Sequence, residues 1–454
     1  MSSNQALAEA LFFEGNRHLA AAEHAAAAAC FREAVTLAPQ LAEAHANLGF
    51  LLEQTGQLDE AEACYRQAMA ILPDCLQLYL NLGALLMARK DFGAAEALYR
   101  QALRFAAGDP ALWSNLGVLL ACLQRDDEAE QCHRTALAIN PDYANARFNL
   151  AYVLLRHGRF DEGWASLEAR DWYERLAQYF EFPRWQGEPL AGRSVLIGFE
   201  AGHGDMIQFC RYAAELKRMG AEQITVVCHP GLKTLFGSMI GVDEVYSLHD
   251  DVPTRGWDYW TPPLSLPYYC QTRLDTIPAT VPYLQAEPAR VAAWATRLPA
   301  ARLRVGLAWL GNPRFENDAD RSLSALDILA PLAAVPGIQF ISLQKGRGED
   351  VSAPIGMALQ SYAGELGDFA DTAALIANLD LVISVDTAVG HLAGALGKPC
   401  WLMLPDYRAD WRWLTGRDDT PWYPHTRLFR QPPGGGWGPV VTQLAEALGQ
   451  LAAR

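Results

Sequence analysis

The chain has 454 residues, of which 51% are hydrophobic and 20% are charged, and its formal net charge is −15. This composition is typical of a globular protein with a large core, and the length is sufficient for about two to four domains. Because an acidic surface repels a phosphate backbone, the charge argues against nucleic-acid binding.

Targeting signals and cysteine-based metal motifs are missing from the sequence. No apolar run reaches the roughly 18 residues of a membrane span, and the N-terminus lacks the pattern of a signal peptide. The nine cysteines form no CxxC pair and no zinc spacing, which is typical of small buried residues in a reducing compartment. We therefore predict a cytoplasmic protein with no membrane span and no metal site.

The first third of the chain repeats itself every 34 residues, and Pro39, Pro73 and Pro141 close three of the units. Five columns are in register: Gly15, Gly49, Gly83 and Gly117; Leu48, Leu82, Leu116 and Leu150; Ala61, Ala95 and Ala129; Phe31, Tyr65 and Tyr99; Ala34, Ala68, Ala102 and Ala136. Small residues allow two helices to pack closely, an aromatic ring fills the space between them, and proline ends the second helix. The pattern resembles the tetratricopeptide repeat, a helix–turn–helix unit.

We assign residues 1–178 to about four and a half such units, which form an α-solenoid. The resemblance implies a concave groove for a protein or peptide. A rigid spacer and a dimerisation surface are the alternatives. A proline-, glycine- and aromatic-rich stretch, FEFPRWQGEPLAG, then ends the helical period, and we assign residues 179–192 to a linker.

Beyond the linker, strand-length apolar runs such as SVLIGF, ITVVC, RVGLAW and LVISV alternate with helical patterns. This alternation predicts parallel α/β structure. We divide it into two Rossmann-like domains, residues 193–288 and 302–438, followed by a closing amphipathic helix, residues 439–454. The predicted fold class is α + α/β.

The first predicted strand ends in the glycine turn EAGHGD, and a helix is predicted to start near Asp205. The backbone around Gly202, His203 and Gly204 is a candidate loop for a phosphate or an acceptor oxygen. A dinucleotide fingerprint would place a third glycine where Ile207 stands, so the loop does not predict NAD binding. Asp205 is a candidate catalytic base, and the alternative is an acid that only complements the helix N-terminus.

Polar side chains follow two further predicted strands. Arg321 comes after RVGLAW and before a helix expected to begin at residues 322–324, and its planar guanidinium suits a phosphate. Gln344 and Lys345 follow IQFIS and are candidates for contacting a phosphate or a ribose. Residues 318–320 form a DxD pattern, which resembles the metal motif of some sugar transferases, but a lone DxD is common. For Arg321 the alternative is a solvated loop charge, and for Lys345 it is a plain surface lysine.

The segment SVDTAVGHLAGALGKP follows another buried run, LDLVI. Thr387 is a natural N-cap for a helix that starts at Ala388 and stops near Gly397. The helix N-terminus carries a partial positive charge and unpaired N–H donors, which suits a diphosphate. Asp386 is a candidate for binding sugar or ribose hydroxyls, and His391, one turn into the helix, for contacting a phosphate oxygen. The alternative is a capped helix with a hydrogen-bonded core histidine.

These motifs resemble glycosyltransferase family 9, the heptosyltransferase-like family, over about residues 190–450. The resemblance rests on Gly204-Asp205, on Asp386-Thr387 with His391, and on HLAGALGKP. The GRFDEGW and FPRWQGEPL segments resemble the bacterial subgroup in which tetratricopeptide repeats precede this domain.

The resemblance implies a GT-B fold, with an inverting, metal-independent mechanism and a nucleotide-diphospho-sugar donor in the C-terminal half. Asp205 matches the acid proposed as catalytic base in the family, and Asp386, Thr387 and His391 match its donor-contacting segment. Arg321 falls where the family has a basic residue near the donor. One departure stands out at the helix mouth, because the family has a glycine where this chain has Ala388.

The sequence therefore predicts a hexosyl- or heptosyltransferase that needs no cofactor, with the repeats presenting a protein or peptide acceptor. Two alternatives stay open. The chain is an interaction scaffold whose transferase-like domain is inactive or only binds nucleotide, or it is another nucleotide-dependent enzyme, such as a sugar-nucleotide epimerase.

Overall fold

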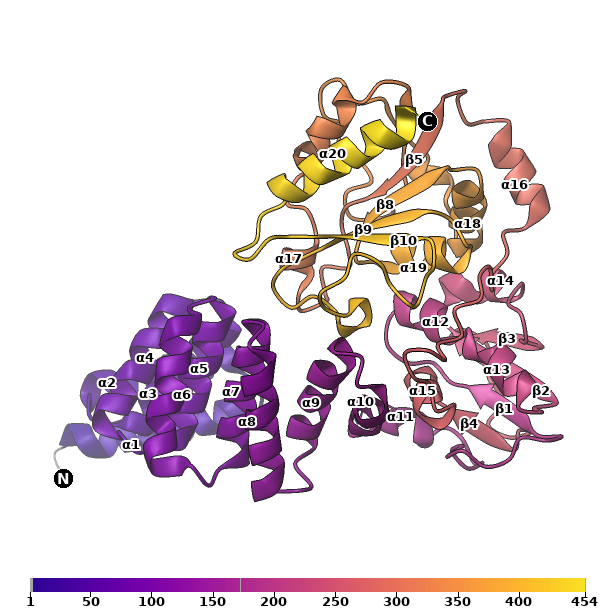
Figure 1. Ribbon diagram of the computed structural model, residues 1–454. Helices are drawn as coiled ribbons and strands as arrows, with labels where there is room; N and C mark the ends of the chain where they lie inside the picture. The colour runs from indigo at the N-terminus through magenta and orange to yellow at the C-terminus, as the bar shows by residue number, and fades with distance from the viewer. Residues whose placement is uncertain (1–2, 172, 454) are drawn as a thin grey trace. The chain divides into compact units, whose positions relative to one another are not determined.

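The computed structural model describes residues 3–171 and 173–453, and the chain divides into two compact units, Met1–Leu150 and Ala151–Arg454. The first unit is built of antiparallel helical hairpins (Figure 1). Its helices are α1 (Ser3–Ala20), α2 (His24–Leu37), α3 (Ala42–Gln54), α4 (Leu58–Ile71), α5 (Leu76–Ala88), α6 (Phe92–Ala106), α7 (Pro110–Cys122), α8 (Asp126–Ile139) and α9 (Ala144–Arg156), which continues into the second unit.

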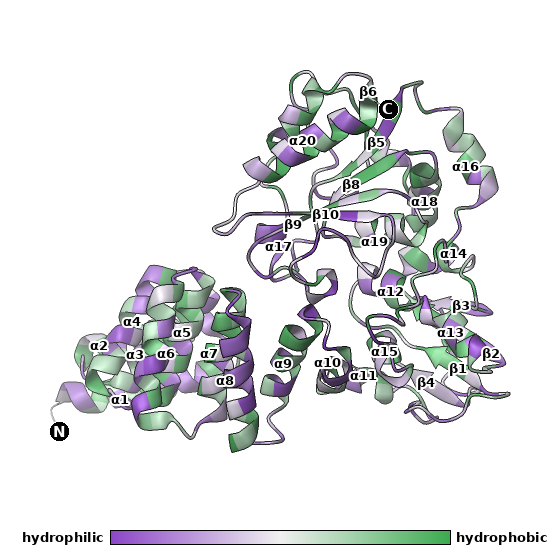
Figure 2. Ribbon diagram, viewed as in Figure 1, coloured by the Kyte–Doolittle hydropathy of each residue, from purple (hydrophilic) through white to green (hydrophobic). Residues whose placement is uncertain are grey.

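The repeat columns form the core of the first unit. Phe31, Tyr65 and Tyr99 are fully buried. Each ring packs on the glycine of the preceding helix, and a Cβ added to Gly83 would lie only 2.2 Å from Tyr99 Cε1. Every helix carries apolar and polar residues together (Figure 2), which is the pattern of a layer with one buried side. The sequence period therefore reports real helix–helix contacts.

After the end of α9, the second unit contains α10 (Phe160–Leu167) and α11 (Glu174–Ala177) and continues into a four-stranded parallel sheet of order β3-β2-β1-β4. The strands are β1 (Ser194–Ile197), β2 (Gln223–Cys228), β3 (Glu244–Ser247) and β4 (Tyr259–Thr261). The associated helices are α12 (His203–Phe209), α13 (Tyr212–Arg218), α14 (Lys233–Phe236) and α15 (Leu266–Tyr269).

A six-stranded parallel sheet follows, with the order β10-β9-β8-β5-β6-β7. The strands are β5 (Leu303–Ala308), β6 (Ile338–Ser342), β7 (Leu359–Ser361), β8 (Leu381–Val385), β9 (Cys400–Leu404) and β10 (Thr426–Arg430). The helices are α16 (Pro288–Ala295), α17 (Asp318–Arg321), α18 (Phe369–Ala377), α19 (Ala388–Ala395) and α20 (Gly438–Ala453). Val440, Val441 and Leu444 of α20 pack into the core of this sheet, as its apolar face requires.

Each sheet reverses its strand order at one point. In the first sheet the chain moves from β1 to β2 on one side and later returns to place β4 on the other side. In the second sheet β5 lies between β6 and the later strand β8. Open α/β sheets bind ligands outside the carboxyl ends of the strands at such switch points. The loops after β1, β5 and β8 therefore mark the candidate site.

The predicted fold class is confirmed: helical repeats precede two parallel Rossmann-like sheets, consistent with a GT-B pair. One local prediction is wrong. No α-helix begins at residues 322–324; a 3-10 helix, η3 (Leu326–Ala334), runs there instead, and Pro331 inside it cannot donate a backbone hydrogen bond. Among the described residues, no helix combines the length and apolar character needed to cross a membrane.

Candidate functional site

Asp205 lies in the first turn of α12, after β1, and both of its carboxylate oxygens accept hydrogen bonds. Gly202 lies in an extended conformation as the N-cap of α12, and its backbone N–H donates to Asp205 Oδ2 over 2.9 Å. The other oxygen, Oδ1, accepts a hydrogen bond from Arg412 Nη2. Asp205 therefore complements its helix N-terminus, as the simpler interpretation predicts, and also faces a cation from the second sheet's domain.

Arg412 is a central residue of this site that the sequence did not single out. It lies on the 3-10 helix η5 (Trp411–Trp413) and its side chain is 7% exposed. Its guanidinium donates to both oxygens of Asp410 over 3.0 Å and to Gln208 Oε1 over 2.8 Å, besides Asp205. Burial lowers the pKa of Arg412, but the carboxylates of Asp410 and Asp205 outweigh it and raise that pKa. Arg412 thus links the two sheet domains as a fixed cation.

His391 is buried at the mouth of α19, in contact with the first loop. A Cβ added to Gly204 would lie 2.8 Å from His391 Cδ2, so only glycine fits there. His391 Nδ1 shares a hydrogen bond of 2.9 Å with the Tyr423 hydroxyl, and its ring stacks on Trp413. Burial, and then Arg412 with two further arginines, hold the pKa of His391 well below its usual range. The imidazole is therefore neutral at physiological pH.

Arg211, one of those further arginines, joins the two sheet domains behind His391. Its guanidinium is buried and donates to the Trp422 carbonyl over 2.8 Å and to the Tyr283 hydroxyl over 3.1 Å. The rings of Tyr283 and Tyr423 lie 4.6 and 4.7 Å from it, which stabilises the cation without a carboxylate. This contact orients Tyr423, which in turn holds His391.

Asp386 follows β8 and stands beside the N-terminus of α19, where the sequence predicts it. Burial first, and then the Asp410 carboxylate, raise the pKa of Asp386 to about 6, although Trp413, Arg321 and Arg412 act to lower it. The Trp413 indole N–H faces this carboxylate but makes no hydrogen bond of standard geometry. The groups around the Asp386 carboxylate therefore act on its pKa in opposite directions.

Thr387 and Ala388 form the helix mouth itself. Thr387 is the N-cap, but its side chain does not cap the helix; Thr387 Oγ1 lies 3.1 Å from Ser384 Oγ instead. The capping prediction is therefore correct in position and wrong in hydrogen bonding. Because the Thr387 side chain does not cap this turn, it leaves the N–H donors of the helix N-terminus to other partners.

The other predicted donor residues lie at the carboxyl ends of β5 and β6. Arg321 ends α17 and pairs with Asp318 over 3.3 Å. Gln344 is buried, and its amide is committed to the backbone of Trp309 and Leu310, so it braces the loop after β5. Lys345 Nζ donates to a backbone carbonyl, that of Ala363, over 2.6 Å. Arg321 therefore acts on Asp386 and His391, since it lowers the pKa of both. Gln344 and Lys345 are instead hydrogen-bonded to backbone groups.

His203 belongs to an aromatic stack that crosses between the two sheet domains. Its ring lies 4.0 Å from that of His229 and 5.2 Å from that of Phe369 on α18. Burial and then His229 lower the pKa of His203 to about 4. His203 therefore acts as a packing residue beside the loop in this structure.

A second buried network lies behind the first loop and was also missed by sequence reasoning. Arg170 donates to Glu200 over 2.6 and 3.1 Å, to Glu168 over 2.8 Å and to Ser265 over 2.7 Å. The Arg170 and Glu200 side chains are 0% and 1% exposed. This network fixes the segment after α10 to the carboxyl end of β1.

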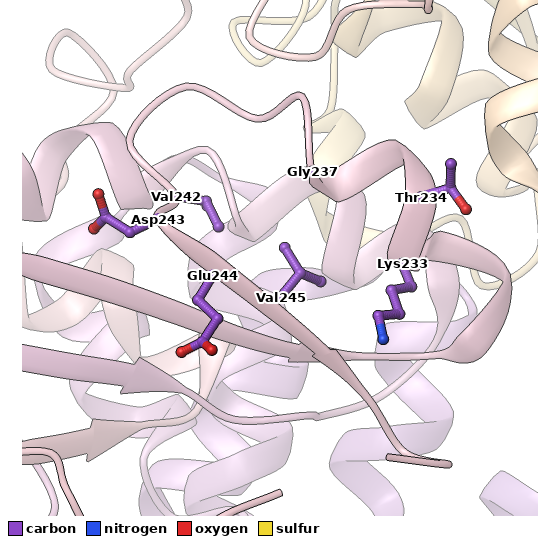
Figure 3. A pocket seen from close by; sticks show the side chains of 7 residues that line it. All are labelled: Lys233, Thr234, Gly237, Val242, Asp243, Glu244 and Val245. Carbon is purple, nitrogen blue, oxygen red and sulfur yellow. The ribbon is translucent and has the colours of Figure 1, made fainter. Parts of the chain in front are cut away.

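Two cavities lie away from these residues. One of about 360 Å³ borders the edge strand β3 (Figure 3) and is lined by Lys233, Thr234, Gly237, Val242, Asp243, Glu244 and Val245. Its Lys233 and Asp243 already pair with Asp250 and Lys217. A second, of about 400 Å³, lies between residues 158–162 and 273–275. In the described part of the chain, no group of three or more His, Cys, Asp or Glu side chains is arranged to hold a metal ion.

Comparison with known families agrees with both parts of this architecture. Tetratricopeptide repeat models match residues 40–108, 112–147 and 134–165. The model of glycosyltransferase family 9 (heptosyltransferase) matches residues 361–401, a range that includes β8 and α19. The chain therefore carries tetratricopeptide repeats in its N-terminal region and a glycosyltransferase family 9 domain after them, which confirms the resemblance found in the sequence.

Individual relatives are more distant. Protein FlbA of Caulobacter vibrioides (strain ATCC 19089 / CIP 103742 / CB 15) is 29% identical over 343 residues, which are 69% of this chain and 56% of FlbA. The chain thus spans little more than half the length of this curated relative. PilF of Pseudomonas aeruginosa is 19% identical and covers 37% of this chain and 77% of its own, with a TM-score of 0.34. The tetratricopeptide repeat protein TTC0263 of Thermus thermophilus is 24% identical and covers 38% and 92%, with a TM-score of 0.32.

Proposed function

We propose that the chain is an inverting, metal-independent glycosyltransferase of the hexosyl- or heptosyl-transferring type, with a nucleotide-diphospho-sugar donor. One observation carries the proposal. The loop after β1 and the mouth of α19, each at the switch point of its own sheet, meet where Gly204 packs against His391 and Ala388, and Arg412 of η5 pairs with Asp205 beside this contact. A carboxylate and an anion-binding helix terminus thus face a common point.

The proposed chemistry uses these groups in fixed roles. Asp205 takes the proton from an acceptor hydroxyl once it leaves Arg412, and the acceptor oxygen attacks the anomeric carbon. The bond from that carbon to the donor phosphate breaks, and the nucleoside diphosphate leaves with the electron pair. The N-terminus of α19, Arg321 and neutral His391 stabilise the leaving group, and Asp386 binds donor hydroxyls.

We further propose that the repeats bind the acceptor as an extended protein segment. The first helices of successive repeats carry asparagines at a strict 34-residue spacing, each partly exposed: Asn47, Asn81, Asn115 and Asn149. An amide both donates and accepts, as a peptide backbone does, so this column suits a peptide whatever its side chains. The acidic composition makes nucleic acid a poor partner, and a cytoplasmic location fits a nucleotide-sugar donor.

A second candidate function is an interaction scaffold whose transferase-like domain is inactive or only binds nucleotide. The observation in its favour is that both oxygens of Asp205 are already hydrogen-bonded, to Gly202 and Arg412. A base whose oxygens are both engaged in the observed state must change partner before it reacts.

The test combines a binding screen with one substitution. Thermal shifts with nucleoside diphosphates and their sugars identify the donor, because a ligand that binds the folded state raises its stability. Donor turnover should then fall by a factor of about 10² to 10⁴ in Asp205→Asn, the usual contribution of a general base, while nucleotide binding persists.

The exposed loop residue Asp251 supplies the matched control, and Asp251→Asn should keep full turnover. Unchanged turnover in Asp205→Asn would remove Asp205 from the mechanism. A wild-type chain that binds none of the nucleotides would favour the scaffold.

A further inference from the structure

Asp318 binds two arginines at once. Its carboxylate is 5% exposed; Oδ1 accepts from Arg321 Nε over 3.3 Å and from Ser322 Oγ over 2.8 Å, and Oδ2 accepts from Arg347 Nη1 over 2.7 Å. Ser322 in turn accepts from the Gly311 backbone N–H over 2.8 Å. A buried carboxylate with every partner fixed holds both guanidiniums in a set geometry.

The loop around Asp318 is shaped to bring these groups together. A Cβ added to Gly311 would lie 2.6 Å from Asp318 Oδ1 and 2.7 Å from Arg321 Nη2. Arg347 is flanked by Gly346 and Gly348, whose φ angles of 73° and 83° lie in the left-handed region that favours glycine. Only small residues allow this arrangement.

The two arginines stand where an open α/β sheet places a ligand. Asp386, Arg321 and Arg347 follow β8, β5 and β6, which are three neighbouring strands of the sheet. Parallel strands end at a common edge, and the strand order reverses between β5 and β8. Arg321 also acts electrostatically on both Asp386 and His391, the two polar side chains at the mouth of α19, and Arg347 is tied to Arg321 through Asp318.

The local charge distribution decides which cation is available for an anion. At Arg412 one guanidinium faces the two carboxylates of Asp205 and Asp410. At Asp318 one carboxylate faces two guanidiniums. The Arg321 side chain is 14% exposed and that of Arg347 is 50% exposed, so the pair has both surplus positive charge and access.

We infer that Asp318 is a positioning residue that presents Arg321 and Arg347 as a two-arginine fork for the diphosphate of the donor. This inference rests on the proposed function, because it assumes a nucleoside-diphosphate ligand, and it adds Arg347 as a donor-binding residue. Planar guanidiniums bind phosphate oxygens through paired hydrogen bonds, which a lysine cannot reproduce. Arg347 takes the role predicted for Lys345, whose amine is engaged by the Ala363 carbonyl.

The experiment measures dissociation constants of matched nucleoside mono- and diphosphates by calorimetry on the full chain, for adenosine, uridine, guanosine and cytidine. With the best-bound base, Arg347→Gln should weaken the diphosphate by about tenfold or more, the usual effect of losing a hydrogen bond to a charged group. It should weaken binding of the monophosphate by less than about threefold, because the fork is arranged for two phosphate groups and a monophosphate has only one. Arg347→Lys should recover only part of the loss.

Two further variants separate positioning from folding. Asp318→Asn should reduce the preference for diphosphate over monophosphate, an effect that a merely structural role would not produce. Arg314→Gln, an exposed arginine of the same loop, is the matched control and should change neither constant. Inorganic pyrophosphate should compete with the diphosphate in the wild type and lose that ability in Arg347→Gln.

The outcomes are distinct. If the wild type binds a nucleoside diphosphate and Arg347→Gln binds it equally well, the fork is wrong and the proposed donor stands. If the wild type binds no nucleotide and no pyrophosphate, the proposed donor is wrong and the fork falls with it.

Discussion

Both units of the chain carry exposed ion pairs, and the described part of the second unit also carries buried ones. In the repeat unit the ion pairs lie on the surface, as in Arg125 with Glu96 and Glu128, whose side chains are 36%, 20% and 51% exposed. In the second unit Arg170 and Glu200 are almost completely buried. Exposed pairs exchange readily with water and contribute little to stability, whereas buried charges persist only with fixed partners. Positioned charge is therefore concentrated in the unit that carries the candidate chemistry.

The largest expected effect comes from breaking the buried pair. Arg170→Met leaves Glu200 buried without its cation and should lower the free energy of unfolding of the second unit by about 3–5 kcal/mol. Urea denaturation of the full chain measures this change.

The double variant Arg170→Met/Glu200→Leu should recover most of the loss, because a packed apolar pair removes the unpaired charge. If Arg170→Met lowers the free energy of unfolding by less than about 1 kcal/mol, the buried network contributes no more than an exposed pair of the repeat unit.

The same contrast explains what the sequence could predict. The repeats rest on contacts between residues less than one period apart, such as Gly83 with Tyr99, and these recur in the chain as visible columns. The strands with long apolar runs were equally visible, since segments such as LVISV are buried throughout. The strands β3, β4, β7 and β10 were not predicted, because they are short or carry polar residues. The small 3-10 segment η3 was not, because its apolar composition resembles that of an α-helix and a single proline decides against it.

Within the candidate site, local patterns located the loops but not their partners. Asp205 was found because it lies beside a glycine-containing turn that follows an apolar strand, and His391 because it lies one turn into a helix that follows another. Arg412 was missed because its role depends on Asp205, 207 positions away in the chain, and because W-R-W resembles simple aromatic packing. The pairing of Arg347 with Asp318 likewise depends on the order of strands β5 and β6, which the sequence does not display.

The repeat unit contains one exception to its apolar core, and this gives the second prediction. His133 occupies the aromatic column of the fourth repeat, is fully buried, and neither ring nitrogen has a hydrogen-bond partner among the described residues. Burial lowers its pKa to about 4, against about 6.5 when unfolded. Between these values the unfolded state binds a proton that the folded state does not.

Stability of the repeat unit should therefore be complete above about pH 7 and fall as the pH drops below 6.5, by about 2 kcal/mol at pH 5. His133→Phe should abolish this dependence. The measurement is the difference in unfolding free energy between variant and wild type at pH 7.5 and pH 5. If this difference in unfolding free energy is the same at both pH values, folded His133 keeps its proton, which requires a hydrogen-bond acceptor for it.

The smallest expected effect is at the surface of the repeat unit, where the ion pairs are exposed. Arg125 contacts Glu96 over 2.8 Å and Glu128 over 2.7 Å, yet Arg125→Ala should cost only about 0.2–1 kcal/mol, because water replaces the lost partner. The loss should shrink further in about 1 M salt, where screening is strong over a few ångströms.

Arg66→Ala, which removes a single exposed i,i+4 pair with Glu62, is the matched control and should cost no more than Arg125→Ala. If Arg125→Ala instead costs as much as Arg170→Met and resists salt, the surface pairs form a cooperative network along the repeats. Charge would then be structural in both units. The burial of ion pairs would then no longer distinguish the unit that carries the candidate site.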